Sequence, residues 1–341
     1  MVPPPERKLV PSNAPVTVAV DAMGGDRAPD VVLAGVAAAL AADPALRVVL
    51  LGQADVLARL SHERVEPVAT TEMIEMDEHA ATAVRSKQDS SIVVGCRLVK
   101  EGRANAFFSA GNTGACMAAS TLVMGRAAGV QRPAIATVIP TLQRPVVLLD
   151  AGANADCRPE HLLQFAHMGA EYAKVILGVE APSIGLLNIG EEPTKGSQLA
   201  QESNALLAER MPGFVGNVEG RDIPYGTTDV IVTDGFTGNV ALKLLEGLAS
   251  ALFAQVKDAM TDSAVKRLAA AVLAPSLRDL RERMDPETYG GAPLLGVAGV
   301  SIIAHGSSSA TAVANGIAVG ARAARGDLSA RIAAAVQGDA Q

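Results

Sequence analysis

Two stretches of the sequence place glycines and small polar residues where an apolar run passes into a segment of helical periodicity. These stretches are Ser109-Ala-Gly-Asn-Thr-Gly114 and Asp234-Gly-Phe-Thr-Gly238, and both contain Gly-x-Thr-Gly. A helix that begins in such a loop presents unpaired backbone N–H groups and the positive end of its dipole, and phosphate is a frequent ligand there. The same residues also suit a tight turn without a ligand. Their repetition favours an anion site.

The same order of strand, polar residue, glycine and helix recurs at Asp21-Ala-Met-Gly-Gly-Asp26, Asp150-Ala-Gly-Ala-Asn154, residues 190–197 and His305-Gly-Ser307. None of these stretches has the glycine spacing of a dinucleotide fingerprint, and Lys195-Gly196 reverses the Gly-Lys order of a P-loop. Lys195 could meet an anion in its loop or be a solvated surface lysine. If parallel strands carry these loops, we expect them at one edge of the sheet, where α/β proteins bind ligands.

The elements that must position these loops alternate along the chain. We expect strands at 16–20, 47–52, 104–110, 135–139, 146–149, 183–189, 214–217, 230–232 and 301–304, and helices after most of them. This alternation predicts the α/β class with a largely parallel sheet. No linker forces a division, so residues 16–330 are expected to form one domain. Residues 1–15 contain five prolines and predict a disordered extension, not a signal peptide.

Composition excludes several functions. The net charge is −7 and aromatic residues are 3% of the chain, which argues against nucleic-acid binding. The three cysteines stand far apart, with no Cys/His cluster, so neither a disulfide framework nor a metal site is predicted and a reducing cytoplasm fits. No stretch reaches the ~18 uninterrupted apolar residues of a membrane span. The apolar run at 31–42 is better explained as a helix packed on the sheet.

Residues 264–284 differ from the rest of the chain. Apolar residues follow one helical stripe, Pro275 interrupts it, and five basic residues lie between them. We expect a cationic amphipathic helical hairpin that could lie on an anionic membrane surface or meet an acidic partner. A dimer or core helix with a solvated face explains the pattern equally well.

Taken together and in order, these motifs resemble one family, the bacterial PlsX phosphate acyltransferases. The resemblance covers roughly residues 16–325. It is carried by Val20-Asp-Ala-Met-Gly-Gly-Asp26, Ser109-Ala-Gly-Asn-Thr-Gly-Ala115, Leu149-Asp-Ala-Gly-Ala-Asn154, Leu186-Leu-Asn-Ile-Gly-Glu-Glu192 with Lys195-Gly196, Gly216-Asn-Val-Glu-Gly-Arg-Asp222, Asp229-Val-Ile-Val-Thr-Asp-Gly-Phe-Thr-Gly-Asn239 and His305-Gly-Ser307. The departures are the proline-rich tail and Ala151, where valine is expected.

The resemblance implies transfer of a fatty acyl group from acyl-[acyl carrier protein] to inorganic phosphate, which gives acyl-phosphate for phospholipid synthesis without a cofactor. It implies a three-layer α/β/α fold similar to the isopropylmalate and isocitrate dehydrogenases. It also implies a cytoplasmic homodimer in peripheral contact with the membrane, whose product feeds a membrane glycerol-3-phosphate acyltransferase. Which basic residues receive the acidic carrier protein stays open, with Arg85, Lys87 and the arginines of 264–284 as candidates.

The residues that match the family's important lysine and asparagine are Lys195 and Asn239. Phosphate is already an anionic nucleophile at neutral pH, so the reaction needs a holder for phosphate and donors for the oxyanion more than a strong base. We expect Lys195 and loop N–H groups to hold phosphate and Asn239 to donate to phosphate or oxyanion. The other residues expected at phosphate or substrate are Asp21, Gly24, Gly25, Asp26, Ser109, Gly111, Asn112, Thr113, Gly114, Asp150, Asn154, Asn188, Asp234, Gly235, Thr237, Gly238, His305, Gly306 and Ser307.

Three other functions compete. A covalent acyl-enzyme through Cys116 is conceivable, although no histidine is near it in sequence. An NAD-dependent oxidoreductase is suggested by the fold likeness and by His305-Gly-Ser307. Two absences in the sequence argue against it: the dinucleotide fingerprint and an aspartate cluster for a divalent metal. A non-catalytic membrane scaffold would use residues 264–284 without the loops.

Overall fold

The computed structural model describes residues 14–261, 263–283 and 286–339, and an 11-stranded sheet forms its centre. In chain order the strands are β1 (Val16–Asp21), β2 (Leu46–Gly52), β3 (Val65–Ala69), β4 (Ala106–Ser109), β5 (Ala134–Ile139), β6 (Val146–Leu149), β7 (Ile184–Asn188), β8 (Phe214–Glu219), β9 (Val230–Val232), β10 (Ala292–Leu295) and β11 (Val300–Ile303). Across the sheet they follow the order β3-β2-β1-β4-β11-β10-β5-β6-β9-β7-β8.

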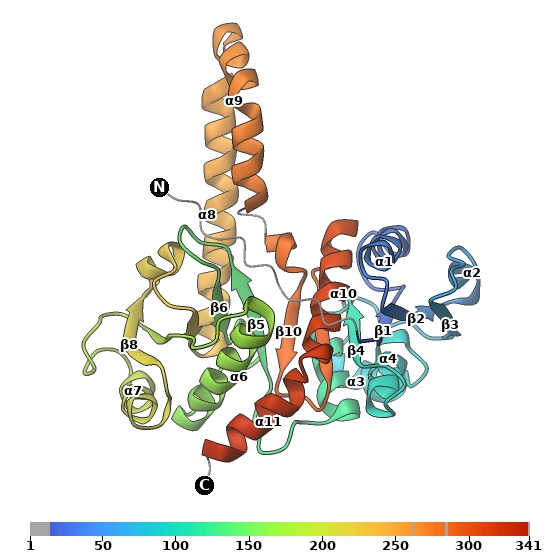
Figure 1. Cartoon of the computed structure of the whole chain (residues 1–341), viewed down its shortest axis with the longest axis horizontal. Coiled ribbons are helices and arrows are strands. Elements are labelled where there is room, and N and C mark those ends of the chain that lie inside the picture. Colours follow the sequence, from blue (N-terminus) through green and yellow to red (C-terminus); the bar gives the residue numbers. More distant parts are fainter. Residues whose placement is uncertain (1–13, 262, 284–285, 340–341) are drawn as a thin grey trace.

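Helices cover both faces of the sheet (Figure 1). Those with side chains in the core under the first face are α1 (Asp30–Ala42), α2 (Ala54–Leu57), α6 (Pro159–Leu177), α7 (Gln198–Arg210), α10 (Ala310–Arg325) and α11 (Leu328–Asp339). Those packed under the second face are α3 (Ala80–Ser86), α4 (Ser91–Lys100), α5 (Thr113–Ala119) with its continuation η1 (Ser120–Met124), η2 (Gly220–Tyr225) and the start of α8 (Gly235–Thr261). The remaining elements are α9 (Ala264–Arg283) and η3 (Pro286–Tyr289).

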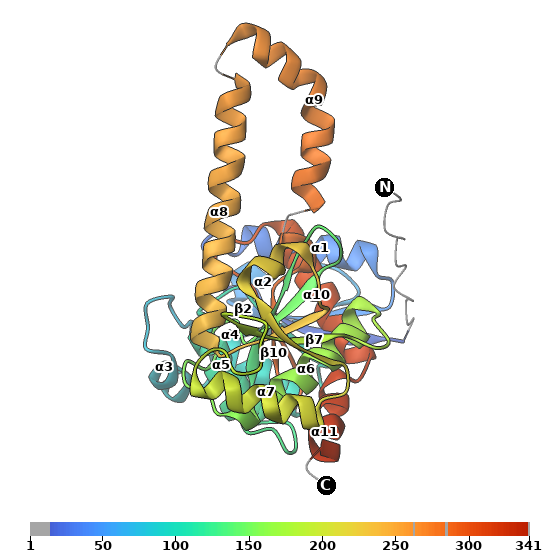
Figure 2. The ribbon, with the colours of Figure 1, turned by 90° about the vertical axis from the view of Figure 1, so that its left-hand side faces the viewer.

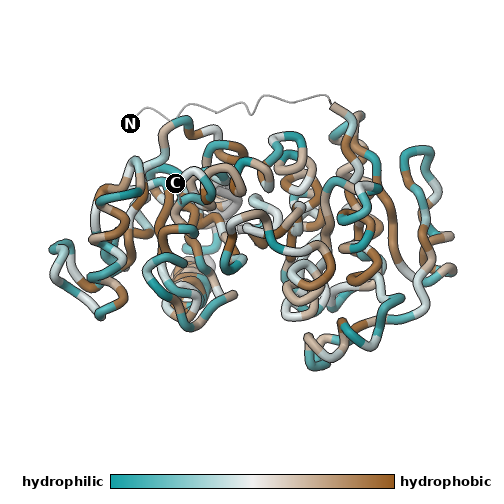
Figure 3. Tube along the Cα trace, turned by 90° about the horizontal axis from the view of Figure 1, so that it is seen from below, coloured by the Kyte–Doolittle hydropathy of each residue, from teal (hydrophilic) through white to brown (hydrophobic). Residues whose placement is uncertain are grey.

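The core follows from the strand sequences. Short runs such as Val230–Val232 and Val146–Leu149 are apolar at every position and fully buried, because helices lie on both sides of them. Hydrophobic segments accordingly concentrate in the middle of the molecule, and the outer loops are hydrophilic (Figure 3). The predicted α/β class with a largely parallel sheet is confirmed: seven of the ten strand pairings are parallel.

The three antiparallel pairings divide the sheet into two halves that run in opposite directions. β3, β2, β1, β4 and β11 are mutually parallel, and so are β6, β9, β7 and β8. Between these halves, β10 is antiparallel to β11 and to β5, and β5 is antiparallel to β6. The carboxyl ends of the two halves therefore lie at opposite edges. The expectation that all the glycine-rich loops share one edge is wrong, because it assumed a single strand direction.

Helices α8 and α9 form an antiparallel arm that projects beyond the body of the molecule (Figures 1 and 2). Within 264–283 the chain is one helix with Pro275 inside it, and its partner is α8. The predicted helical hairpin within 264–284 is therefore wrong, since α9 alone fills this segment as far as Arg283; residue 284, like residues 1–13, lies outside the described residues. By length and composition α8 alone, among the described helices, could cross a membrane, and none of its apolar window is buried.

Candidate functional site

Three of the predicted loops meet at the carboxyl edge of the half that contains β1. The Ser109 hydroxyl donates to Asp21 Oδ2 at 2.7 Å, and the Asp26 N–H donates to the carbonyl of Gly306 at 2.8 Å. A Cβ at Gly24 would lie 2.5 Å from the backbone nitrogen of Gly111, so these two loops touch through their backbones. The structure thus brings together residues 21–26, 109–114 and 305–307, which we call the β1-side loops.

Asp21 organises these loops instead of facing solvent. Its side chain is buried, and it accepts hydrogen bonds from the Ser109 hydroxyl and from the N–H of Met23. Burial raises the pKa of Asp21, while these hydrogen bonds oppose the rise. In the adjoining loop, the Nδ1 of His305 lies 3.2 Å from the N–H of Ser307 and 2.8 Å from its hydroxyl, which holds residues 305–307 in a tight turn.

Among the β1-side loops, the first turn of α5 is the part best suited to bind an anion. The Asn112 Oδ1 caps it by accepting from the N–H of Ala115 at 2.9 Å, and its Nδ2 donates to the carbonyls of Glu75, Met76 and Glu78. The N–H groups of Thr113 and Gly114 face no acceptor within the described residues. Because the cap is a neutral amide, the positive end of the helix dipole is not offset by a carboxylate.

Two further loops meet at the carboxyl edge of the other half, residues 150–154 and 234–239, which we call the β6-side loops. The N–H of Gly235 donates to the carbonyl of Asn154 at 2.7 Å, and Asn239 Nδ2 donates to the carbonyl of Ala151 at 3.1 Å. A Cβ at Gly238 would lie 1.9 Å from the carbonyl oxygen of Asp150, so only glycine allows α8 to approach this closely. One of the two N–H groups of the Asn239 amide therefore holds the loop.

The buried Asp150 carboxylate is the centre of the β6-side loops. Its Oδ1 accepts from the N–H groups of Ile135, Gly152 and Ala153 at 2.9–3.1 Å, and its Oδ2 accepts from the N–H and the side-chain amide of Asn154 at 2.8 Å. Burial raises the pKa of Asp150, and the five N–H donors oppose that rise. The side chain is thus committed to the loop's own backbone.

A carboxylate already occupies the start of α8. Asp234 accepts from the N–H of Thr237 at 2.8 Å and from its hydroxyl at 2.7 Å. This negative cap uses the favourable field at the helix N-terminus and disfavours a second anion there. The start of α10 is similar, because Ser309 donates to the Glu287 carboxylate. Of these three helix starts, that of α5 suits phosphate best.

Lys195 stands apart from both loop sets. It lies at the same edge as the β6-side loops, its side chain is exposed, and it makes no ion pair with any described carboxylate. Asn188 shapes its loop by donating to the carbonyl of Lys195 at 3.0 Å. Within the described residues no hydrogen bond or ion pair joins Lys195 to Asn239 or to α5, so its role in binding phosphate stays a prediction.

One groove on the second face of the sheet reaches both loop sets. It has a volume of about 630 Å³ and runs from Gly114 on α5 to Ala153 and Asn154 in the β6-side loops. Its other lining residues are Ala81, Arg85, Met117, Ala118, Thr121, Leu122, Arg126, Gln131, Arg132, Pro133 and Leu294. The groove reaches both loop sets because it follows α5 and η1, which cross this face from one edge of the sheet towards the other.

Sequence reasoning missed most of this groove. Arg126 and Arg132 belong to the segment between η1 and β5, which carries no glycine-rich motif, and Leu294 belongs to an unpredicted strand. The one available signal was the basic, proline-ended Gln131-Arg-Pro133 just before a strand. The sequence predicts Arg85 only as a candidate to receive the carrier protein.

The cysteines do not provide a nucleophile. Cys116 is fully buried, and burial raises the pKa of its thiol to about 12, so the reactive thiolate is scarce at neutral pH. Burial raises the pKa of Cys157 to about 11. No group of three His, Cys, Asp or Glu residues in the described ranges could hold a metal ion.

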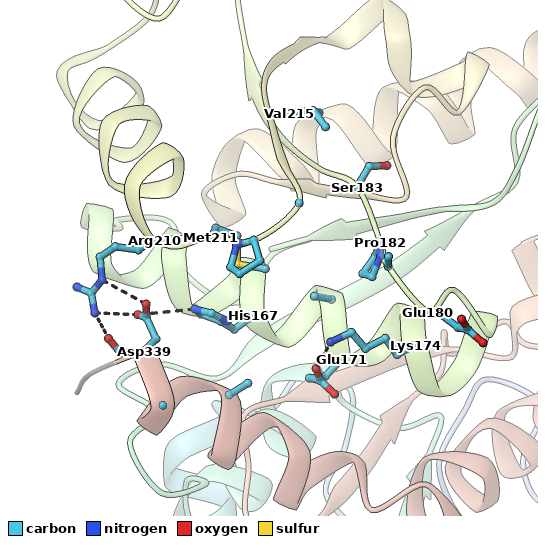
Figure 4. Close-up of a pocket in the computed structure, with 16 residues that line it drawn as sticks. His167, Glu171, Lys174, Glu180, Pro182, Ser183, Arg210, Met211, Val215 and Asp339 are labelled. Carbon is cyan, nitrogen blue, oxygen red and sulfur yellow. Dashed lines mark hydrogen bonds and ion pairs between the residues drawn. The ribbon is translucent and has the colours of Figure 1, made fainter.

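A second hollow, of about 840 Å³, lies away from the motif residues, between α6, α11 and the segments that precede β7 and β8 (Figure 4). There the Asp339 carboxylate pairs with Arg210 at 3.0 Å and lies 3.7 Å from His167 Nε2. These contacts tie the end of α11 to α6 and α7. We interpret this cluster as structural, because its charges are paired with one another.

Known proteins share this sequence over most of its length. The phosphate acyltransferase of Heliobacterium modesticaldum is 50% identical over 327 residues, which are 94% of this chain and 96% of that protein. The phosphate acyltransferase of Desulfitobacterium hafniense strain DSM 10664 is 52% identical over 308 residues, 89% of this chain and 92% of the relative.

Solved structures share the fold at low identity. A phosphotransacetylase from Streptococcus pyogenes superposes with a TM-score of 0.62 at 16% identity, covering 91% of this chain and 94% of that one. The EutD phosphotransacetylase of Staphylococcus aureus gives 0.60 at 15% identity with the same coverage. The family model described as fatty acid synthesis protein matches residues 16–331. The chain belongs to this family of fatty acid synthesis proteins.

Proposed function

We propose that this protein is an acyltransferase that moves a fatty acyl group from a thioester to inorganic phosphate. The observation that carries the proposal is its identity of about 50% to proteins named phosphate acyltransferase, over nine-tenths of the chain. The start of α5 lies at one end of the groove and is capped by the uncharged amide of Asn112, so the helix dipole there can attract phosphate.

The reaction balances without a cofactor. A phosphate oxygen forms a bond to the thioester carbonyl carbon, and the C–S bond then breaks with its electron pair going to sulfur. The proton carried by hydrogen phosphate neutralises the thiolate, which leaves an acyl phosphate and a free thiol. The protein's contribution is to hold the two substrates together and to stabilise the oxyanion.

In this proposal the N–H groups of Thr113 and Gly114 hold phosphate at one end of the groove. The acyl donor would extend along the groove from Ala153 and Asn154, on the loop that Asn239 supports, so that its thioester carbonyl reaches this phosphate. The family resemblance suggests Asn239 and Lys195 as further donors to phosphate or the oxyanion. Removing one oxyanion donor costs about 100-fold or more in turnover.

The finer proposals concern partners and location. We infer that the acyl donor is acyl-[acyl carrier protein], and that the product passes to a membrane glycerol-3-phosphate acyltransferase. A second copy of the chain would cover the apolar stripe along α8, whose members recur every four residues and are 46–67% exposed: Phe236, Val240, Leu244, Leu248, Leu252 and Val256. The cationic residues of α9 would place the protein at a membrane surface from the cytoplasm.

The test follows acyl-[acyl carrier protein] consumption with and without inorganic phosphate. Phosphate-dependent loss of the thioester, with acyl phosphate as the product, is the expected result. Loss without phosphate, or none at all, would refute the proposal. Absorbance at the nicotinamide band during turnover tests the dehydrogenase alternative, which rests on His305-Gly-Ser307 and on a shared fold: a 4-hydroxythreonine-4-phosphate dehydrogenase from Klebsiella pneumoniae superposes with a TM-score of 0.51 at 14% identity.

A further inference from the structure

The groove between α5 and the β6-side loops carries a charge opposite to that of the whole protein. Acidic residues outnumber basic ones by 36 to 29 along the chain, yet three arginines and no carboxylate line this groove. All three arginines, Arg85, Arg126 and Arg132, are exposed, and none pairs with a carboxylate in the described ranges. Arg126 donates to the carbonyl of Gln131 at 2.6 Å and keeps its other N–H groups. Arginines without a carboxylate partner recognise carboxylates and phosphates.

The floor of the groove has a different character. Met117, Ala118, Leu122 and Leu294 line it, and Leu122 is 54% exposed although it is a large apolar side chain. The groove is also elongated, because it reaches from the start of α5 to the β6-side loops at the other edge of the sheet. A ligand that fits would be long and slender, with an uncharged middle and anionic groups near the arginines.

We propose that this groove receives the acyl thioester arm of an acidic carrier protein, with Arg85, Arg126 and Arg132 meeting the carrier's carboxylates and the phosphodiester at the base of the arm. This inference rests on the proposed function and locates its donor. The net negative protein would repel an acidic partner elsewhere, so a local cationic rim directs it to this place.

The lining also argues for a carrier protein over a free nucleotide thioester. No Phe, Tyr or Trp is among the residues that line the groove, so an adenine ring would find no aromatic platform. A protein partner does not need one, since its contacts are spread over side chains around the rim. The arginines act here as a docking surface and take no part in the bond changes.

The test compares two donors on one set of variants. The variants are the triple charge reversal Arg85→Glu/Arg126→Glu/Arg132→Glu and its milder form with Gln at all three positions. Arg47→Glu, an exposed arginine on β2 outside the groove, is the matched control. Each is assayed with the carrier-borne acyl thioester and with a neutral acyl-pantetheine thioester, at low and at physiological salt, after its thermal transition has been checked.

The expected result is that the triple reversal lowers kcat/KM for the carrier-borne donor by about tenfold or more relative to the neutral donor. The Gln triple should lower it less, Arg47→Glu should not change the ratio, and salt should shrink the difference in wild type. Equal losses with both donors, or no loss with either, would overturn the docking inference. Wild-type protein that consumes neither donor in the presence of phosphate would instead refute the proposed function.

Discussion

Asp150→Asn is the substitution whose cost can be worked out most directly from the structure. The two carboxylate oxygens accept three and two N–H groups respectively, and the side chain is fully buried. The amide of asparagine can replace only one oxygen by NH₂. Whichever way the amide is turned, at least two buried N–H groups lose their acceptor and face another donor.

Leaving a buried donor unsatisfied costs about 1–3 kcal/mol, so two donors give a loss of about 2–6 kcal/mol in the free energy of unfolding. At roughly 2–4 °C per kcal/mol, the thermal midpoint should fall by about 4–24 °C. Turnover should fall as well, because the same loop accepts the hydrogen bond from Asn239 and lines the groove.

The assay is thermal and urea unfolding followed by circular dichroism, with acyl transfer measured well below the midpoint. The matched control is Asp156→Asn, an exposed aspartate two residues beyond the loop, which should stay within about 0.5 kcal/mol of wild type. An unfolding midpoint for Asp150→Asn equal to that of wild type would show that Asp150 is held as a protonated acid, and would refute this reasoning.

Three further predictions concern a thiol, an imidazole and the α8 stripe. Cys116→Ser should retain acyl transfer, and mass spectrometry should find Cys116 unalkylated by iodoacetamide in the native protein; rapid alkylation or lost turnover would restore the acyl-enzyme alternative. Burial and then the neighbouring Arg158 lower the pKa of His161, so the stability contributed by its neutral ring is present above pH 6.5 and is lost as pH falls through the lowered value. His161→Gln should therefore lose less stability than wild type in urea titrations on acidification; a parallel loss contradicts this. Leu248→Glu should yield monomers by light scattering if α8 pairs with a second copy, and an unchanged mass would exclude that pairing.

The strands and their glycine-rich ends were largely predictable from sequence, because β-branched runs and glycine punctuation are local signals. Most predicted strands, including the central Val230–Val232, lie where they were expected. Two strands, β3 and β10, were missed. β3 is only partly buried and contains Pro67, so it lacks a continuous apolar run. β10 is short and has glycines on both sides, which made the segment resemble a loop.

The roles of the polar loop residues were less predictable. Asp21, Asp150 and Asn188 were expected at the substrate, but their side chains hold loop backbones in the structure. A sequence shows that an aspartate follows a strand; it does not show whether the carboxylate turns inward to accept from its own loop. The arginines of the groove come from positions 85, 126 and 132, and only the packing of α3 against α5 brings them together.

The direction of the sheet halves, in contrast, could have been inferred from connection lengths. Residues 140–145 join β5 to β6, and residues 296–299 join β10 to β11, whereas a parallel crossover needs about a dozen residues or more. Neighbouring strands with such short links must be antiparallel. With the pairing of β10 and β5, three reversals separate β11 from β6, and an odd number turns the second half against the first.

This reversal constrains the chemistry. Loops at opposite edges of a sheet cannot grip one small anion together, so the β1-side and β6-side loops must act on different parts of the reaction. The groove under α5 reaches both sets, and it crosses the face of the sheet between them. A compact substrate would contact only one set, whereas an acyl group on a long thioester arm can extend from one edge to the other. The architecture therefore favours a reaction in which phosphate waits at one end and the acyl donor enters along the length of the groove.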